Sequence, residues 1–133
     1  MNLDEAQVWI DRSLTMRETY GGLRIKAPLL EKKGDAKGAE ALRAKALTVA
    51  TEVEVNQQGY ALLGQNKVDE AIALFQRNVK DHPDSWNVYD SPAEAYALKG
   101  DKAQAMANYH RAYDMVKQED QRTRIQEELA KLN

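Results

Sequence analysis

The residue types that most often perform catalysis or bind metals are sparse in this sequence. Its two histidines, His82 and His110, each lack a second histidine or a cysteine at the helical spacing that metal sites use. We expect both to be solvated side chains. Ser91 has no histidine adjacent to it in the sequence that could serve as a base, so a serine nucleophile is not indicated either.

Carboxylate pairs and a glycine pair also lack the arrangement that chemistry requires. Asp69-Glu70 and Glu127-Glu128 are adjacent in expected helices, so their side chains diverge rather than converge on a substrate or an ion. Gly21-Gly22 follows no strand and precedes no Gly-Lys-Ser, so it does not indicate a phosphate-binding loop. The sequence therefore predicts no catalytic, cofactor-binding or metal site, and we expect a protein that is not an enzyme.

The composition narrows the class of protein further. The chain has 133 residues, of which 43% are hydrophobic and 30% charged, enough for one domain with a core. Its net charge of −2 gives no basic excess for nucleic-acid binding, and no run of 18 apolar residues indicates a membrane span. No cysteine is present, so disulfides are excluded. The N-terminus lacks the layout of a signal peptide, so the expected compartment is the cytoplasm by default, unless the chain is excised from a longer exported protein.

A pattern with a period near 33 residues runs through the chain. A small residue inside a helical stretch recurs at spacings of 33, 32 and 34, at Ala6, Ala39, Ala71 and Ala105. A turn residue precedes the last three of them by five residues, at Gly34, Asn66 and Gly100. A fixed period of this size is typical of stacked helical units, which present a surface, so the pattern favours binding over chemistry.

Apolar periodicity and the turn residues predict seven or eight helices and no strand. The expected spans are Leu3 to Tyr20, Leu23 to Lys33, Ala36 to Thr51, Val55 to Leu63, Val68 to Asp81, Trp86 to Leu98, Lys102 to Val116 and Gln121 to Leu132. In the last span, Ile125, Leu129 and Leu132 share one face, which suits a helix that caps the final repeat.

The small residues and one proline resemble those of the tetratricopeptide repeat (TPR), a helix-turn-helix unit of 34 residues. Small residues match a position in the first helix of each repeat (Ala27, Gly59, Ala93), the start of the second helix (Ala39, Ala71, Ala105) and a later position in it (Ala46, Asn78, Ala112). Pro83 matches the proline between repeats, and Tyr96 matches an aromatic residue late in the first helix. The resemblance covers nearly the whole chain and is most specific from Val55 to Met115.

The resemblance implies an all-α, TPR-like, right-handed superhelix, a solenoid of helix-turn-helix repeats, forming one domain over residues 1–133. Its expected parts are a partial repeat with only the second helix (1–20), repeat 1 (21–52), repeat 2 (53–84), repeat 3 (85–118) and a C-terminal capping helix (119–133).

Three residues depart from the family pattern. Gln58 stands where the family has a large apolar residue, Pro92 occupies the equivalent position one repeat later, and Pro28 lies inside an expected first helix. A proline in a helix interior removes a hydrogen bond and costs about 3 kcal/mol. Three alternatives remain open for Pro92: a kinked helix, a helix that starts late at Ser91, and a rearranged or exchanged packing.

In the family, the first helices line the concave face that holds a ligand. Mapping by repeat position implies a peptide-binding groove lined by Arg24, Lys32, Asn56, Tyr60, Asp90 and Glu94. The alternative is a plain solvated face. The family's capture of a C-terminal carboxylate is not expected here, because Asp90 and Glu94 would repel an acidic peptide.

The sequence thus leaves two functions open. The first is a protein-interaction module or scaffold that binds a peptide or a helix of an unidentified protein partner in its groove. The second is a self-associating structural unit, a homodimer or a swapped dimer, because a second helix without its mate would expose Val8, Trp9 and Leu14.

Overall fold

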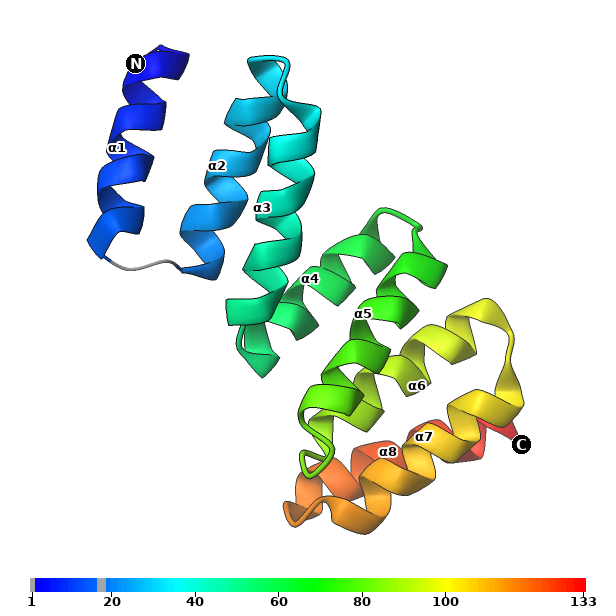
Figure 1. Cartoon of the computed structure of the whole chain (residues 1–133). Coiled ribbons are helices and arrows are strands. Elements are labelled where there is room, and N and C mark those ends of the chain that lie inside the picture. Colours follow the sequence, from blue (N-terminus) through cyan, green and yellow to red (C-terminus); the bar gives the residue numbers. More distant parts are fainter. Residues whose placement is uncertain (1, 17–18) are drawn as a thin grey trace. The chain divides into compact units, whose positions relative to one another are not determined.

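The computed structural model describes the backbone of residues 2–16 and 19–133 and the side chains of residues 2–9 and 19–133. Within these ranges the chain forms helices and no strand (Figure 1), so the predicted all-α class is confirmed. The helices are α1 (Leu3–Met16), α2 (Tyr20–Lys32), α3 (Ala36–Val49), α4 (Glu52–Gly64), α5 (Val68–Asp81), α6 (Asn87–Lys99), α7 (Lys102–Met115) and α8 (Glu119–Leu132).

The chain divides into two compact units, Met1–Thr51 and Glu52–Asn133. In the first unit α1 packs on α2, and α2 packs on α3. In the second unit each helix from α4 to α8 packs on the next one along the chain. Packing of consecutive helices on one another is the arrangement expected of a helical repeat protein.

Short side chains and left-handed turns determine where several helices begin and end. The hydroxyl of Thr19 accepts a hydrogen bond from the backbone N–H of Gly22 at 3.0 Å and caps α2, and Asp101 caps α7 through the N–H of Gln104 at 3.1 Å. The expected turn residues all have positive φ, at 89° for Gly34, 64° for Asn66 and 89° for Gly100. Asn is the side chain that tolerates this conformation best after glycine, so Asn66 can replace a turn glycine.

Five predicted helix boundaries are wrong by two or more residues. Two of them are the start of α2, which is Tyr20 instead of Leu23, and the end of α3, which is Val49 instead of Thr51. The first span does not continue to Tyr20, because α1 ends at Met16 and Tyr20 begins α2; residues 17 and 18 lie outside the described part of the chain. Helix α4 begins at Glu52 instead of Val55, and α8 begins at Glu119 instead of Gln121. Both earlier starts place acidic residues in the first turn, where they interact favourably with the helix dipole.

Apart from Ala6, which is only partly buried, the small residues that align the repeats are buried. Ala27, Ala39, Ala71, Ala93, Ala105 and Ala112 are fully buried, Ala46 and Asn78 are 1% and 2% exposed, and Gly59 is also buried. Gly59 allows α4 and α5 to approach closely, since a Cβ atom there would overlap the ring of Phe75 on α5. These residues set how closely neighbouring helices pack.

Both unusual prolines lie inside helices. Helix α6 begins at Asn87, five residues before Pro92, so a helix that starts late at Ser91 is the wrong interpretation. Pro92 is fully buried, whereas Pro28 in α2 is exposed. Each proline removes the N–H that would bind the carbonyl four residues earlier, which for Pro92 is that of Val88.

Candidate functional site

Three helices of the second unit carry polar side chains at equivalent repeat positions. Residues 34 positions apart on α4, α6 and α8 form two rows, Asn56–Asp90–Arg124 and Tyr60–Glu94–Glu128. The rows are four residues apart on α4, α6 and α8, so they occupy successive turns of the same side of each helix. We call these six residues together with Ser91 the polar face.

Hydrogen bonds join α4 to α6 within the polar face. The hydroxyl of Tyr60 donates to Oε2 of Glu94 at 2.7 Å, and the hydroxyl of Ser91 donates to Oδ1 of Asn56. The ring of Tyr60 also packs edge-on against Phe75, with centroids 5.5 Å apart. These contacts hold Tyr60, the one aromatic ring of the polar face, in a fixed position while 36% of the residue stays exposed.

An ion pair joins α6 to α8. Nη2 of Arg124 lies 2.7 Å from Oδ2 of Asp90, and Nε of Arg124 donates to Gln121 at 3.0 Å. Asp90 is only 8% exposed, and its second oxygen, Oδ1, is buried without a hydrogen-bond donor among the described residues. Oδ2 of Asp90 is therefore paired with Arg124, whereas Oδ1 has no partner among the described residues.

Negative charge concentrates on this face. Burial raises the pKa of Asp90, Arg124 opposes that shift, and the charges of Glu94 and Glu128 add to it. Burial also raises the pKa of Tyr109 on α7, and Glu128, Asp90 and Glu94 all raise it further. The negative charges of all three carboxylates therefore reach the hydroxyl of Tyr109, which indicates that the three groups lie close enough to influence one another electrostatically.

The structure brings together four of the six residues predicted to line a groove: Asn56, Tyr60, Asp90 and Glu94 all belong to the polar face. The other two, Arg24 and Lys32, are exposed on α2 in the first unit. The guanidinium of Arg24 lies 5.4 Å from the ring centroid of Tyr20 and donates to its hydroxyl at 3.3 Å, so Arg24 has a local partner.

Two members of the polar face, Arg124 and Glu128, are absent from the groove predicted from the sequence, and Ser91 is predicted only as the alternative start of a late helix. The signal for the first two was present, because each follows its α6 equivalent, Asp90 or Glu94, by 34 residues. The apolar pattern of α8 indicates only a cap on the final repeat, although α8 also continues the two polar rows of α4 and α6. The bond between Ser91 and Asn56 had no signal in the sequence, because it depends on how α4 and α6 pack.

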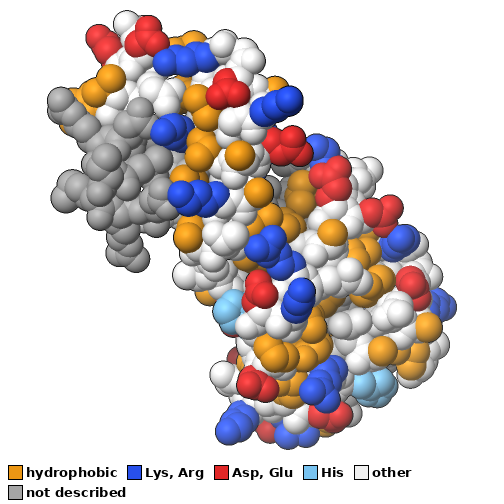
Figure 2. Space-filling view, in the orientation of Figure 1, with side chains coloured by type: hydrophobic (Ala, Val, Ile, Leu, Met, Phe, Trp, Pro, Cys, Tyr) orange, Lys and Arg blue, Asp and Glu red, His pale blue; other side chains and the backbone are white. Residues whose placement is uncertain are grey.

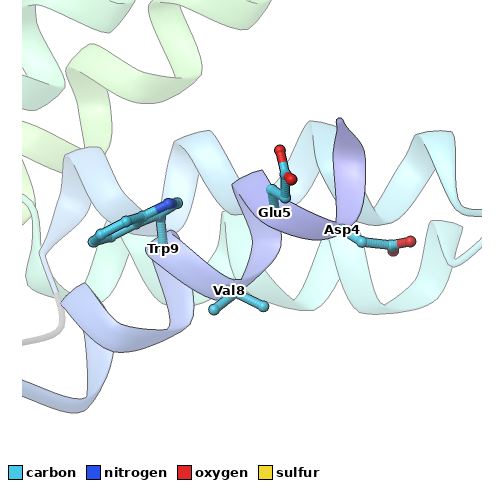
Figure 3. A pocket seen from close by; sticks show the side chains of 4 residues that line it. All are labelled: Asp4, Glu5, Val8 and Trp9. Atoms are coloured by element: carbon cyan, nitrogen blue, oxygen red, sulfur yellow. The ribbon is translucent and has the colours of Figure 1, made fainter. Parts of the chain in front are cut away.

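A second surface of interest lies on α1, where the sequence predicts self-association. Val8 is 51% exposed and Trp9 is 60% exposed, and together with Asp4 and Glu5 they line a shallow hollow (Figure 3). Asp4 is held by an ion pair to Lys33 at 2.8 Å, at the end of α2. The side chain of Leu14, the third residue of that prediction, lies outside the described residues.

Charged side chains of both signs lie on the surface. On the side that Figure 2 shows, Lys and Arg side chains alternate with Asp and Glu. None of the described helices is both long and apolar enough to span a bilayer. Among the described residues, no group of three or more His, Cys, Asp and Glu side chains is arranged to hold a metal ion.

Comparison of the chain with protein-family models and with curated proteins finds no match.

Proposed function

We propose that this protein is a non-catalytic interaction module whose polar face binds a peptide or a helix of a protein partner. The observation that carries the proposal is the row of bonds along α4, α6 and α8, which joins Tyr60 to Glu94 and Asp90 to Arg124. These bonds hold polar groups from three helices in place before a partner arrives. Binding to groups that are already fixed loses less conformational entropy than binding to mobile ones.

The composition of the polar face also suits peptide recognition. It combines an aromatic ring, Tyr60, with hydrogen-bonding and charged groups on rigid helices, and buried or half-buried aromatic residues are frequent energetic centres of interfaces. The resemblance to the tetratricopeptide repeat points the same way, because first helices line the ligand face in that family. Under this proposal α4, α6 and α8 are first helices.

A display experiment tests the proposal. Peptides selected from a random library on the wild-type protein should bind at least about fivefold more weakly to Tyr60→Ala, because aromatic centres of interfaces contribute more than about 1 kcal/mol. Trp9→Ala, a matched truncation of an exposed aromatic residue in the other unit, should leave their affinity unchanged. Thermal melts of both variants verify that they fold. If no selected peptide distinguishes Tyr60→Ala from the wild type, the polar face is not a binding site.

A second candidate function is self-association through α1. The specific observation in its favour is that two consecutive large apolar residues of α1, Val8 and Trp9, are exposed. Exposed apolar surface is a common feature of sites where protein chains associate. The two functions are compatible, since they use surfaces in different units.

A further inference from the structure

We propose that the partner segment bound by the polar face is cationic, carrying Lys or Arg side chains next to an apolar one. This inference rests on the proposed function and specifies the chemistry of its partner. It follows from the balance of charge on the polar face, from two carboxylates that a partner can reach, and from an exposed leucine beside them.

Carboxylates outnumber cations on the polar face. Asp90, Glu94 and Glu128 are opposed by Arg124, which is bound to Asp90, and by Lys131, which lies 3.1 Å from Glu128. The side chain of Lys131 is 71% exposed, so water screens this second pair strongly. The surrounding unit has the same sign, with ten Lys and Arg against fourteen Asp and Glu over residues 52–133, a net charge of −4. A cationic partner is attracted to such a surface over a distance of about 10 Å.

A second, independent observation concerns hydrogen bonding. Oδ1 of Asp90 is buried and has no donor among the side chains and backbone groups that the structure describes. Asp90 lies one turn before Glu94 on α6, within reach of the charges of Glu94 and Glu128. Because Oδ1 is buried, Arg124 alone among the described residues compensates the charge of Asp90. A partner therefore reaches the exposed carboxylate of Glu94 and the partly exposed one of Glu128. Ammonium and guanidinium groups have N–H donors and no acceptor, so they match these two accessible acceptors. An acidic segment would add acceptors and negative charge to a face that already has both in excess.

Apolar surface borders the carboxylates. Leu98 lies one turn after Glu94 on α6 and is 65% exposed. Tyr60, which is bound to Glu94 from α4, offers further partly exposed ring surface. A segment that places an apolar side chain against Leu98 and a cationic one near Glu94 would use both features, and this spacing is available to a helix or to an extended chain.

The test uses the peptides that lose affinity for Tyr60→Ala, a substitution that changes no charge and so does not bias the outcome. Their sequences should be enriched in Lys and Arg over the starting library. If the enriched peptides are neutral or acidic, the inference is overturned while the proposed function stands. If no peptide depends on Tyr60, both are overturned.

A charge-neutralising variant then measures the electrostatic contribution directly. Glu94→Gln keeps an oxygen acceptor for the Tyr60 hydroxyl and removes the negative charge, so it should weaken the tightest selected peptide about two- to fivefold. Glu70→Gln, at an exposed position on α5, is the matched control and should leave the affinity unchanged. Raising NaCl from about 50 to about 300 mM should weaken binding to the wild type more than to Glu94→Gln. Equal affinities for the wild type and Glu94→Gln would overturn the inference.

Discussion

Among single residues, Asp90 is the one whose protonation should affect stability most directly. Burial raises the pKa of its carboxyl above the usual value of 3.8 in spite of the ion pair with Arg124. A carboxyl with a raised folded-state pKa binds its proton more tightly in the folded state, so its contribution to stability is present at low pH and is lost as the pH rises through the folded-state pKa.

Asp90→Asn should therefore gain stability relative to the wild type as the pH rises from about 4 to 7, because the amide does not titrate. Arg124, whose side chain is 41% exposed, can be hydrated when its partner is neutral. Urea unfolding at several pH values measures the difference in free energy of unfolding, with Glu70→Gln as the control for a surface carboxylate. A difference that stays constant or falls with pH would show that the ion pair outweighs the burial of Asp90.

Gly59 gives a second prediction for a single residue. A methyl group there would overlap the ring of Phe75, which is fully buried, so Gly59→Ala should overpack this contact and cost about 1–3 kcal/mol of stability. Gly64 lies on the same helix, and a methyl group there would meet no other atom within 4 Å, so Gly64→Ala should be neutral or slightly stabilising. If the urea midpoints of the two variants were equal, the close packing of α4 on α5 at Gly59 would be contradicted.

The burial of the small residues could be predicted from the sequence, because their spacing repeats. The specific contact of Gly59 with Phe75 could not, because a 34-residue period fixes which helix sides meet but not which side chain fills the space. The same limit applies to Asp90, whose burial depends on the packing of α8 against α7 and on its bond to Arg124.

For individual helices, the two prolines offer a comparison within one chain. Replacing either with Ala restores an N–H for the carbonyl four residues earlier, which is worth up to about 3 kcal/mol, less about 0.4–1 kcal/mol because the unfolded chain becomes more flexible. Pro92 is fully buried and loses packing on truncation, at about 0.8 kcal/mol for each buried CH₂ group, whereas Pro28 is exposed and loses little.

We therefore expect Pro28→Ala to stabilise its unit by about 2 kcal/mol and Pro92→Ala to stabilise its unit by about 1 kcal/mol or less. Circular dichroism during urea unfolding measures both. A larger gain for Pro92→Ala would indicate that the buried ring strains α6 more than its packing helps.

The ends of a helix could be predicted from the sequence where a turn residue or the apolar spacing determines them. The turns at Gly34, Asn66 and Gly100 could be predicted because the left-handed conformation restricts the residue type. The boundary between α1 and α2 could not, because Gly21-Gly22 suggests a break, whereas the hydroxyl of Thr19 caps the helix just before both glycines. The capping bond of Thr19 thus allows α2 to begin at Tyr20, although Gly21 and Gly22 both have low helix propensity.

For the molecule as a whole, the sequence predicted an all-helical repeat protein, and the structure confirms this architecture. The sequence also predicted a groove, and four of its six residues lie on the polar face. It did not predict that the final helix would supply Arg124 and Glu128 to that surface, because the repeat pattern in α8 lacks the small residues that identify the other helices. At the position of Ala93, α8 has Glu127, which is exposed. The two polar rows therefore continue into α8, whereas the small residues that reveal the repeats end at α7.

In the first unit, the exposed apolar side chains of α1 predict self-association of the protein. Val8 and Trp9 expose more than half of their surface on α1, so association of two chains through this helix would bury apolar area that is now in water. We expect sedimentation equilibrium at tens of micromolar protein to give about twice the chain mass of 15.0 kDa. Trp9→Glu should return the protein to a monomer, because a buried charge without a partner opposes the contact. Leu98→Glu, a matched change of an exposed leucine in the other unit, should leave the dimer intact. A wild-type protein that stays monomeric over this range would exclude α1 as an interface, and a dimer broken only by Leu98→Glu would move the interface to α6.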